Sequence, residues 1–354
     1  MSCKHPLKGF VIGFNPDTGK PNYKVTSYNV HHLEKKSPNS NFDCILDDTY
    51  APNRIYYNDW IEIPCGQCIG CRLEYSRQWA NRCALEMQYH DSTLFLTLTY
   101  DDKHLPTKIM DTFINPLTGE VKENFEIHPL VKKDMQDFMK SLRDKVGYKK
   151  LRFFGCGEYG SESGRPHLHI IVFGLALSDL TKYKTIKQGD EWITYYNSKT
   201  IDDCWKHKGF CVIAPATWET VAYTSRYVTK KLNGKMKDFY ELTGLEPEFC
   251  LMSRKPGIGK QYLEDNLEHI FNTNRIVISN LKGSRKVAPP KYYKKQLEKI
   301  DEDLYNKVNS HNKEQAEITK AIKLSKTSLS YLDYLESEEI ELKEKIKTLH
   351  RNKV

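Results

Sequence analysis

Two histidines separated by one residue are the first candidates for chemistry in this chain. His167 and His169 stand in an apolar stretch that continues through residues 170–173, which predicts a central strand. Residues two apart on a strand face the same side, so both imidazoles can reach one cation. Two polar rings are costly to bury in such a strand unless they are used. The alternative is that both histidines are structural.

A carboxylate is expected as the third ligand of this cation. Imidazoles combined with one acid and open positions suit Mg²⁺ or Mn²⁺ bound to phosphate oxygens. Glu158 ends the strand that precedes the histidines and can lie beside them in a hairpin, whereas Glu162 falls in the turn and is the weaker candidate.

Two tyrosines provide candidate nucleophiles. Tyr223 and Tyr227 are four residues apart in a predicted helix, so both phenols can share one face. A phenol has a pKa of about 10 and needs a nearby cation or metal to attack as the phenolate. Arg226, Lys230 and Lys231 supply such cations. Because the chain has 22 tyrosines, ordinary aromatic packing is the alternative.

Three closely spaced cysteines indicate a second metal site. Cys65, Cys68 and Cys71 form C-x-x-C-x-x-C, one ligand short of a tetrahedral zinc site, and Cys3 is the preferred fourth ligand. The substitutes for Cys3 are His5, Cys44 and Cys83. Clustered thiols in a chain with ten cysteines favour metal binding over disulfides in a cytosolic protein. An iron–sulfur cluster and scattered reduced core cysteines remain open.

Positive charge is concentrated in one segment. The chain has a formal net charge of +8, and residues 269–297 contain no acidic residue. Either a solvated basic face or a segment that follows DNA phosphates would have this composition. With Arg226, the cations taken as nucleic-acid ligands are Arg275, Lys282, Arg285, Lys286 and Lys291.

The elements that must position these residues follow from periodicity. Helices are predicted at 72–90, 129–146 and 217–232, and strands at 93–100, 151–158, 167–173 and 209–215. Residues 1–64 read as irregular, 102–128 as a loop or hairpin, and 175–208 as a polar insertion. In the first strand Leu94, Leu96 and Leu98 share one face, which leaves Thr97 and Thr99 on the other. The order of elements predicts an α+β domain with helices packed on a largely antiparallel sheet.

Three segments are expected. Residues 1–92 would form an N-terminal region with the cysteine cluster, residues 93–290 the nuclease core, and residues 291–354 a charged helical tail, either a helical hairpin or a weak coiled coil. No apolar run long enough for a bilayer and no secretory signal are present, which predicts a cytoplasmic protein without a membrane partner.

Several motifs, in order, resemble a known superfamily. Phe95–Tyr100, Gly164–His169 and Tyr223–Lys231 are similar to the three motifs of HUH endonucleases. The resemblance is closer to the rolling-circle replication initiation proteins of microviruses of the gokushovirus type, and it covers about residues 60–295. The segments that carry it are Cys65–Arg72, Arg77–Ala80, Thr97–Asp102, Gly157–Gly160, Met252–Gly259 and Pro290–Tyr293.

This resemblance implies a metal-dependent nickase with an HUH-type antiparallel sheet. One tyrosine would form a 5′-phosphotyrosine at the replication origin and the second would act at the end of the round, with Lys230 or Lys231 as phosphate clamp or proton handler. The implied partners are origin DNA, single-stranded or supercoiled duplex, and a host helicase and polymerase in the bacterial cytoplasm.

Other functions stay open at this point. A plasmid relaxase or single-strand transposase would share the HUH motifs, although the cysteine cluster and Met252–Gly259 argue against both. A zinc-stabilised, non-catalytic binder of single-stranded DNA would use the tyrosines for stacking. A scaffold for replication partners would depend mainly on the C-terminal helices.

Overall fold

The chain forms two compact units in the computed structural model, which describes residues 3–114, 119–147, 150–160, 163–188, 191–227, 238–280 and 283–347. The central unit spans residues 75–314, and the terminal unit combines the residues up to 74 with those from 315 onward. Helices α1 (Ile69–Met87) and α8 (Glu302–Leu324) cross the two boundaries. This division differs from the one expected at residues 92 and 290, because the two ends of the chain share a unit.

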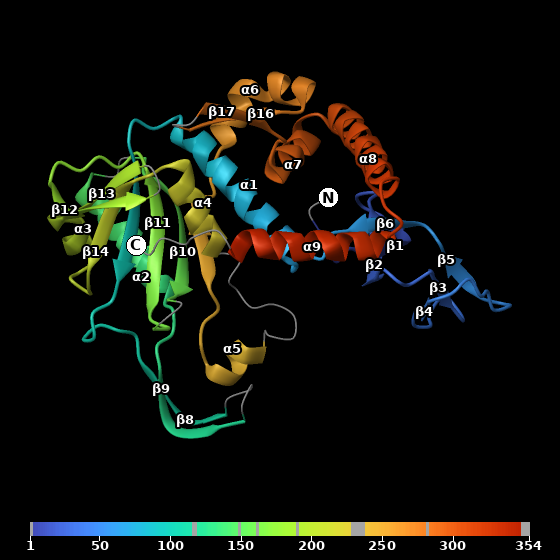
Figure 1. The fold of residues 1–354 in the computed structure, drawn as a ribbon, viewed down its shortest axis with the longest axis horizontal. Helices are drawn as coiled ribbons and strands as arrows, with labels where there is room; N and C mark the ends of the chain where they lie inside the picture. Colours follow the sequence, from blue (N-terminus) through green and yellow to red (C-terminus); the bar gives the residue numbers. More distant parts are fainter. Residues whose placement is uncertain are drawn as a thin grey trace. The chain divides into compact units, whose positions relative to one another are not determined.

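A seven-stranded antiparallel sheet organises the central unit (Figure 1). Its strand order is β12-β13-β14-β7-β11-β10-β15. Four strands fill stretches that periodicity predicted: β7 (Thr93–Thr99), β10 (Arg152–Tyr159), β11 (Pro166–Phe173) and β14 (Cys211–Pro215). Strand β15 (Phe249–Met252) forms one edge. The expected α+β architecture with an antiparallel sheet is confirmed.

Residues 175–208 contain regular structure that the sequence did not indicate. They form β12 (Leu180–Gln188), β13 (Glu191–Ser198) and the short helix α3 (Lys199–Cys204). Strand β12 is an edge strand with several exposed lysines, a common device against edge-to-edge pairing, so its apolar alternation is weak. The interpretation of this segment as an unpatterned insertion is therefore wrong.

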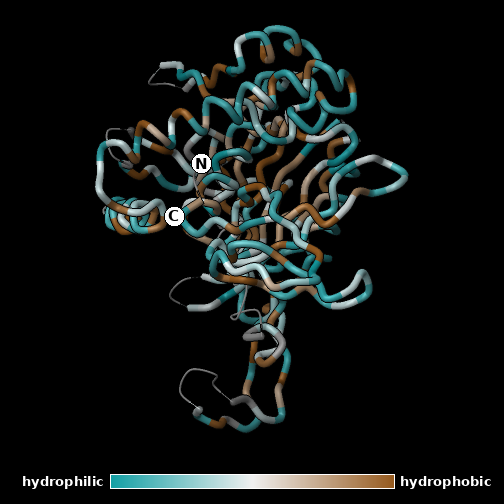
Figure 2. Tube along the Cα trace, turned by 90° about the vertical axis from the view of Figure 1, so that its right-hand side faces the viewer, coloured by the Kyte–Doolittle hydropathy of each residue, from teal (hydrophilic) through white to brown (hydrophobic). Residues whose placement is uncertain are grey.

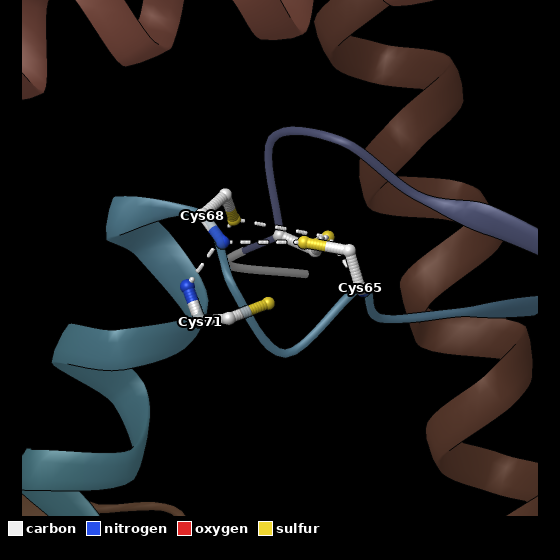
Figure 3. A group of neighbouring side chains, drawn as sticks. Cys65, Cys68 and Cys71 are labelled. Carbon is white, nitrogen blue, oxygen red and sulfur yellow. Dashed lines mark hydrogen bonds between the residues drawn. The ribbon is translucent and has the colours of Figure 1, made fainter. Parts of the chain in front are cut away.

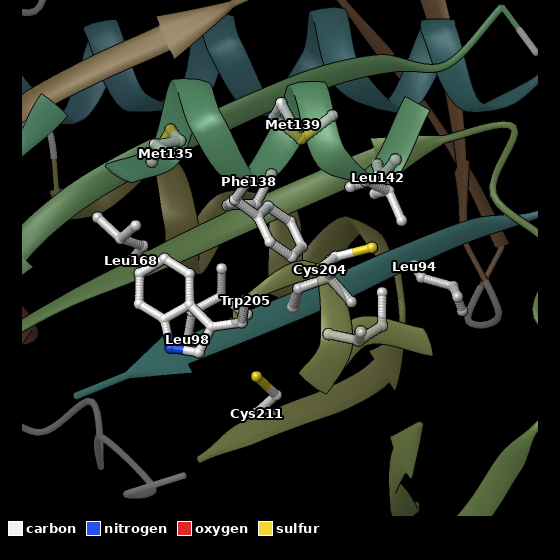
Figure 4. Packing of buried hydrophobic residues seen from close by; sticks show 14 of the residues in the cluster. Leu94, Leu98, Met135, Phe138, Met139, Leu142, Leu168, Cys204, Trp205 and Cys211 are labelled. Carbon is white, nitrogen blue, oxygen red and sulfur yellow. The ribbon is translucent and has the colours of Figure 1, made fainter. Parts of the chain in front are cut away.

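One face of the sheet is covered by helices α2 (Lys132–Lys145) and α3 (Figure 4). The apolar stripe of α2, which comprises Met135, Phe138, Met139 and Leu142, is buried as predicted. It packs with Leu94, Leu96 and Leu98 of β7 in one core cluster. Burial of each such side chain contributes about 1.5–3 kcal/mol, so this core holds β7 rigidly in the middle of the sheet.

The opposite face is covered at one end by α1 and by α4 (Trp218–Tyr227). There Ala80, Cys83 and Val221 pack with Phe95 and Ile171. In Figure 2 the hydrophobic colour is concentrated in the strands in the middle of the view. Further along β7, β10 and β11 this same face becomes polar, which places the candidate catalytic residues beside the covered end.

The remaining elements of the central unit build a third core around α1. They are the hairpin β8 (Lys108–Ile114) and β9 (Val121–Ile127), helix α5 (Asp238–Thr243), α6 (Lys260–Thr273), the hairpin β16 (Ile276–Asn280) and β17 (Gly283–Val287), and α7 (Lys291–Ile300). Leu85 of α1, Leu263 of α6 and Tyr293 of α7 are buried together there. The expected hairpin within 102–128 is confirmed by β8 and β9.

A buried carboxylate connects α1 to the segment before α6. Glu86 is 4% exposed; it contacts the Arg152 guanidinium, lies 3.2 Å from His90 Nε2, and accepts a 2.6 Å hydrogen bond from the Gly259 backbone N–H. A buried carboxylate is tolerated because cations and donors surround it. This contact set gives the Met252–Gly259 motif a structural role in joining α1, β10 and α6.

The terminal unit contains two small antiparallel sheets. One has the order β2-β1-β6, from β1 (Leu7–Phe14), β2 (Pro21–Ser27) and β6 (Trp60–Ile63); the other has the order β4-β3-β5, from β3 (His32–Lys35), β4 (Asp43–Ile45) and β5 (Ile55–Tyr57). The interpretation of residues 1–64 as irregular is wrong. Most of these strands are short and half-exposed, so their alternation is hidden by frequent turns.

The predicted charged C-terminal helices belong to this unit as well. Helix α9 (Tyr331–Lys347) is joined to the N-terminal segment by an ion pair of 2.5 Å between Lys4 Nζ and Glu338. Lys320 of α8 reaches Glu62 of β6 at 3.3 Å. The helical tail is thus packed onto the terminal strands.

Candidate functional site

The hairpin of β10 and β11 brings the predicted metal ligands together. Its register pairs Glu158 directly with His167 and Cys156 with His169. Residues directly opposite in an antiparallel pair point to the same face, and residues two apart do so as well. Glu158, His167 and His169 therefore all lie on the face that α1 and α4 cover at one end.

The three side chains converge on one point. Oε1 of Glu158 lies 2.9 Å from Nε2 of His167 and 3.0 Å from Nε2 of His169. Glu158 and His169 are each 2% exposed, whereas His167 is only partly buried. We call this group the Glu-His-His cluster; it is buried on one side and accessible at His167.

The outer nitrogens of both rings have partners that fix the ring orientation. His167 Nδ1 lies 3.1 Å from the Arg165 carbonyl oxygen, which can only accept, so Nδ1 carries the proton. The lone pair of His167 Nε2 is then directed at the Glu158 carboxylate. Two lone pairs at hydrogen-bond distance repel each other unless a cation lies between them, so this donor set fits a bound metal.

The distances within the cluster fit a small hard cation. Octahedral Mg²⁺ has ligands at about 2.0–2.1 Å, which places adjacent ligand atoms about 2.9 Å apart. The measured separations of 2.9 and 3.0 Å match that edge. Two imidazoles and one carboxylate leave further coordination positions for phosphate oxygens, and the cluster is compatible with metal binding.

Thr97 is a further residue of this site that sequence reasoning did not single out. It lies opposite His169 on the neighbouring strand β7, is 7% exposed, and its Oγ1 is 3.1 Å from His169 Nδ1. The His169 ring also stacks on Phe95 at a centroid distance of 5.6 Å. The alternation of the β7 leucines and threonines was the available signal, but only the strand pairing identifies the partner.

Helix α4 carries the predicted nucleophiles next to this cluster. It packs against β10 and β11, and the Cys156 thiol lies 3.5 Å from the carbonyl oxygen of Thr224. Its first turn is capped by Thr217, whose Oγ1 accepts from the Thr220 N–H at 3.2 Å, as the sequence predicted. Tyr223 and Tyr227 are both helical residues of α4, one turn apart.

Some of the predicted residues fall outside the described part of the chain. For Tyr223, Arg226 and Tyr227 this applies to the side chains only. It applies entirely to Glu162, Lys230, Lys231 and Lys282.

The other predicted DNA ligands are exposed cations of the central unit. Arg275 precedes β16, Arg285 and Lys286 lie on β17, and Lys291 begins α7. The Arg285 guanidinium stacks 4.0 Å above the ring of Trp218, the first residue of α4. One of these cations is therefore held directly against the helix that carries the tyrosines.

The predicted cysteine cluster is formed in the terminal unit (Figure 3). The thiols of Cys65, Cys68 and Cys71 point toward one another. The Cys3 sulfur completes the group, and one sulfur from each residue lies within 4.8 Å of all the others. Of the substitutes for Cys3, His5 contacts Glu339, Cys44 is exposed on β4, and Cys83 is buried in the core of the central unit.

The sulfur positions fit tetrahedral coordination. The Cys3 sulfur lies 3.7 Å from that of Cys65 and 3.9 Å from that of Cys68. Four sulfurs at about 2.3 Å from a central zinc would be about 3.8 Å apart, whereas a disulfide requires about 2.05 Å. All ten cysteines are free thiols.

Backbone amides surround the same sulfurs. Cys68 Sγ accepts from the N–H groups of Lys4 at 3.2 Å and Cys71 at 3.4 Å. Burial opposes ionisation of Cys68, but these hydrogen bonds outweigh it and lower its pKa to about 7. Burial raises the pKa of Cys3 to about 11, so the group as a whole needs a cation to hold several thiolates. The cluster is compatible with metal binding.

Comparisons with known proteins agree with this arrangement. The family model for replication-associated protein ORF2 matches residues 93–232, which contain β7, the Glu-His-His cluster and α4. Replication-associated protein ORF2 of Spiroplasma virus 4 is 35% identical over 283 residues, 77% of this chain and 80% of the relative. Replication-associated protein VP4 of Bdellovibrio phage phiMH2K is 30% identical over 266 residues, 72% and 75% of the two chains.

A more distant relative is replication-associated protein ORF4 of Chlamydia phage 1, which is 27% identical over 67% of this chain and 54% of its own. No solved structure matches the chain. Among the helices that the structure describes, none has the length and apolar character of a membrane span. The chain belongs to the family of replication-associated proteins of small phages.

Proposed function

We propose that the protein is a metal-dependent DNA nickase and strand-joining enzyme that initiates rolling-circle replication of a small single-stranded DNA phage genome. The convergence of Glu158, His167 and His169 beside α4 supports this proposal most directly. We also infer that the seven-stranded sheet is of the HUH type, with the two histidines on its central strand β11.

The Glu-His-His cluster would hold Mg²⁺ or Mn²⁺. When bound, such an ion draws negative charge from the non-bridging oxygens of the scissile phosphate. Glu158 offsets the positive charge at the buried side of the site, and the hydrogen bond from His167 Nδ1 to the Arg165 carbonyl keeps Nε2 free as a ligand. The more exposed His167 side is where a DNA phosphate would enter.

Tyr223 or Tyr227 would then attack the phosphorus in line. The phenolic oxygen forms the new P–O bond as the phenol proton leaves, and the P–O3′ bond breaks, so that the 3′ oxygen takes up a proton. The products are a 5′-phosphotyrosine and a 3′-hydroxyl that a host polymerase can extend. The second tyrosine would cleave the regenerated origin, and the freed 3′-hydroxyl would displace the first tyrosine to close a circle.

The cationic residues would hold the DNA. Lys230 or Lys231 would contact the phosphate or handle the phenol proton. Arg226, Arg275, Lys282, Arg285, Lys286 and Lys291 would neutralise phosphates on either side of the cleaved bond. We place this activity in the bacterial cytoplasm, with origin DNA and the host helicase and polymerase as partners.

The cysteine cluster would bind a structural zinc ion. Four thiolates at tetrahedral spacing form a closed site that leaves no position for a substrate. Cys3 and the segment 65–71 are far apart in the sequence, so a bound ion would tie the two ends of the N-terminal region together.

Covalent trapping tests the proposed function. Purified protein is incubated with Mn²⁺ and single-stranded oligonucleotides that tile its genome, and adducts are detected on denaturing gels. We expect one oligonucleotide to form an adduct that disappears in the Tyr223→Phe/Tyr227→Phe double variant and with EDTA. The matched control is Tyr89→Phe, a tyrosine of the same unit whose hydroxyl donates to Asp265 at 2.7 Å; it should keep the adduct.

Two results would reject the proposal. An adduct that persists in the double variant would mean that another residue is the nucleophile. If no oligonucleotide gives an adduct although the protein binds single-stranded DNA, the protein is a non-catalytic binder. An origin adduct in the wild type, with loss of closure in one single Tyr variant, would support two alternating nucleophiles.

A further inference from the structure

Two exposed aromatic rings stand beside each other in the central unit. Tyr183 of β12 is 48% exposed and Phe210, which precedes β14, is 46% exposed. Their ring centroids are 5.1 Å apart and the rings meet edge to face at 65°. We call these two residues the aromatic platform. Large apolar rings are usually buried, so an exposed pair held in contact indicates a binding surface.

The backbone of the sheet places both rings deliberately. The pairing of β12 with β13 shifts at Tyr183, which is the extra residue of a β-bulge between Lys182 and Lys184. Bulges re-aim side chains and are frequent next to active sites. The Phe210 carbonyl oxygen accepts from both the N–H and the Oγ1 of Thr99, at 3.1 and 2.8 Å, so this residue is attached to the end of β7.

Gly209 permits this attachment. A Cβ at that position would lie 2.3 Å from the Thr99 carbonyl oxygen and 2.6 Å from the Asp101 nitrogen, both backbone atoms that cannot move aside cheaply. A side chain is therefore excluded there, and Phe210 is held close to β7.

The platform continues the face that carries the Glu-His-His cluster. Thr99 is paired with His167, and Phe210 is bonded to Thr99, so these residues occupy three successive strands. Neighbouring strands are about 4.8 Å apart, which places Phe210 about 10 Å from His167 along the sheet. That is about three stacked nucleotides at 3.4 Å each. Val212 and Ala214, which follow Phe210 at alternate positions, pack in the core on this same face.

Positive charge accompanies the rings. Lys184 Nζ lies 5.3 Å from the ring of Tyr183 and 5.5 Å from that of Tyr195. Strand β12 reads LTKYKTIKQ, with three lysines and no acidic residue. Aromatic rings interleaved with cations are the composition of surfaces that stack bases and bind the phosphates between them.

We propose that the aromatic platform stacks one or two bases of a single DNA strand whose phosphate lies at the Glu-His-His cluster. This inference rests on the proposed function, because the cluster is what assigns the strand its position. Tyr183 and Phe210 are binding residues in this view, and they place the phosphate relative to the nucleophiles. The platform reads no sequence by itself, since every base has an aromatic face.

Binding without cleavage tests the platform. Fluorescence anisotropy is measured in EDTA with two labelled probes: an oligothymidylate of about 15 nucleotides, and an abasic chain with the same number of phosphates. We expect Phe210→Ala to weaken binding of the thymidylate about 5-fold or more, the effect of losing one stacked base. Binding of the abasic chain should not change, because it has no base to stack.

The chain offers a matched control and a rescue. Trp192 is 68% exposed on the same β12–β13 hairpin, but it precedes Ile193 of the core and so faces the other side of the sheet; Trp192→Ala should not affect either probe. Phe210→Trp should retain binding, and Phe210→Leu, which keeps most of the volume without an aromatic face, should lose it. Thermal melting confirms that each variant is folded.

Several outcomes would overturn the platform. They are equal losses on both probes, an unchanged thymidylate affinity in the Phe210→Ala variant, full binding by the Phe210→Leu variant, or a similar loss in the Trp192→Ala variant. If the Phe210→Ala variant does not fold, Tyr183→Ala is measured against both probes by the same criteria. A wild-type protein that discriminates between the probes but forms no covalent adduct would reject the nickase and leave the platform standing.

Discussion

Thr97 provides the sharpest test of the Glu-His-His cluster, because its hydroxyl acts on the metal only through His169. The Thr97→Val substitution keeps the shape of the side chain and removes the Oγ1 that lies 3.1 Å from His169 Nδ1. The site is buried, so water cannot easily replace the lost partner. The ring would be less firmly oriented toward Glu158.

The expected loss follows from two independent magnitudes. A hydrogen bond between neutral groups contributes about 0.5–1.5 kcal/mol, which is about 2-fold to 13-fold in a binding constant. Changes in the partners of metal-bound histidines commonly reduce metal affinity about 10-fold to 100-fold. The two ranges overlap near 10-fold, and we expect the Thr97→Val variant to bind Mn²⁺ about 10-fold more weakly than the wild type.

Electron paramagnetic resonance of free Mn²⁺ measures this affinity without any DNA or turnover. Thr97→Ser keeps the hydroxyl and should bind Mn²⁺ as the wild type does. Thr185→Val is the matched control, since its Oγ1 contacts Thr194 on β13 at 3.1 Å and no ligand of the cluster. An unchanged Mn²⁺ affinity in a folded Thr97→Val variant would refute the reasoning that Thr97 orients His169 toward a bound ion.

Two further predictions concern the structure around the site. Cys68→Ser should remove the bound zinc and lower the melting temperature, because structural zinc contributes on the order of 10 kcal/mol to folding; Cys44→Ser, at an exposed thiol, should retain both, and unchanged zinc in the Cys68 variant would contradict the assignment. Glu86→Gln should lower the free energy of unfolding in urea by about 3–5 kcal/mol, because it leaves Arg152 without its buried partner, whereas Glu264→Gln, in an exposed pair, should cost less than about 1 kcal/mol. Although burial opposes it, hydrogen bonds and the Arg152 charge lower the pKa of Glu86 below its ordinary 4.5, so this stability is present above pH 4.5 and is lost as the pH falls through the lowered pKa. The difference between wild type and Glu86→Gln should therefore shrink in acid, and a constant difference would argue against an ionised Glu86.

The strands and helices nearest the site were predictable because their side chains alternate between buried and polar environments. The leucines of β7 and the stripe Met135, Phe138, Met139 and Leu142 of α2 encode both period and direction, and each was buried as expected. The β12–β13 hairpin lacked this signal. Its strands lie toward the edge of the sheet, so lysines replace apolar residues, and the aromatic platform was missed with it.

The ligand sets were predictable to different degrees. The spacing of His167 and His169 determines that they share a face, and Cys65, Cys68 and Cys71 are close in sequence, so local geometry restricts them strongly. Glu158 depended on the length of the turn before β11, since one residue more or less would have moved it to the other face. The register that pairs Glu158 with His167 is a property of the folded hairpin.

By itself the sequence determined the kinds of atoms available: two imidazoles on one strand face, a run of thiols, and two phenols one helical turn apart. Only the tertiary structure decided which distant residues join them. Cys3 reaches the thiols from 62 residues away, and Thr97 reaches His169 from 72 residues away, because strand pairing and packing, rather than spacing along the chain, bring these atoms into contact. Long-range contacts of this kind arise from the whole core at once, so no local pattern records them.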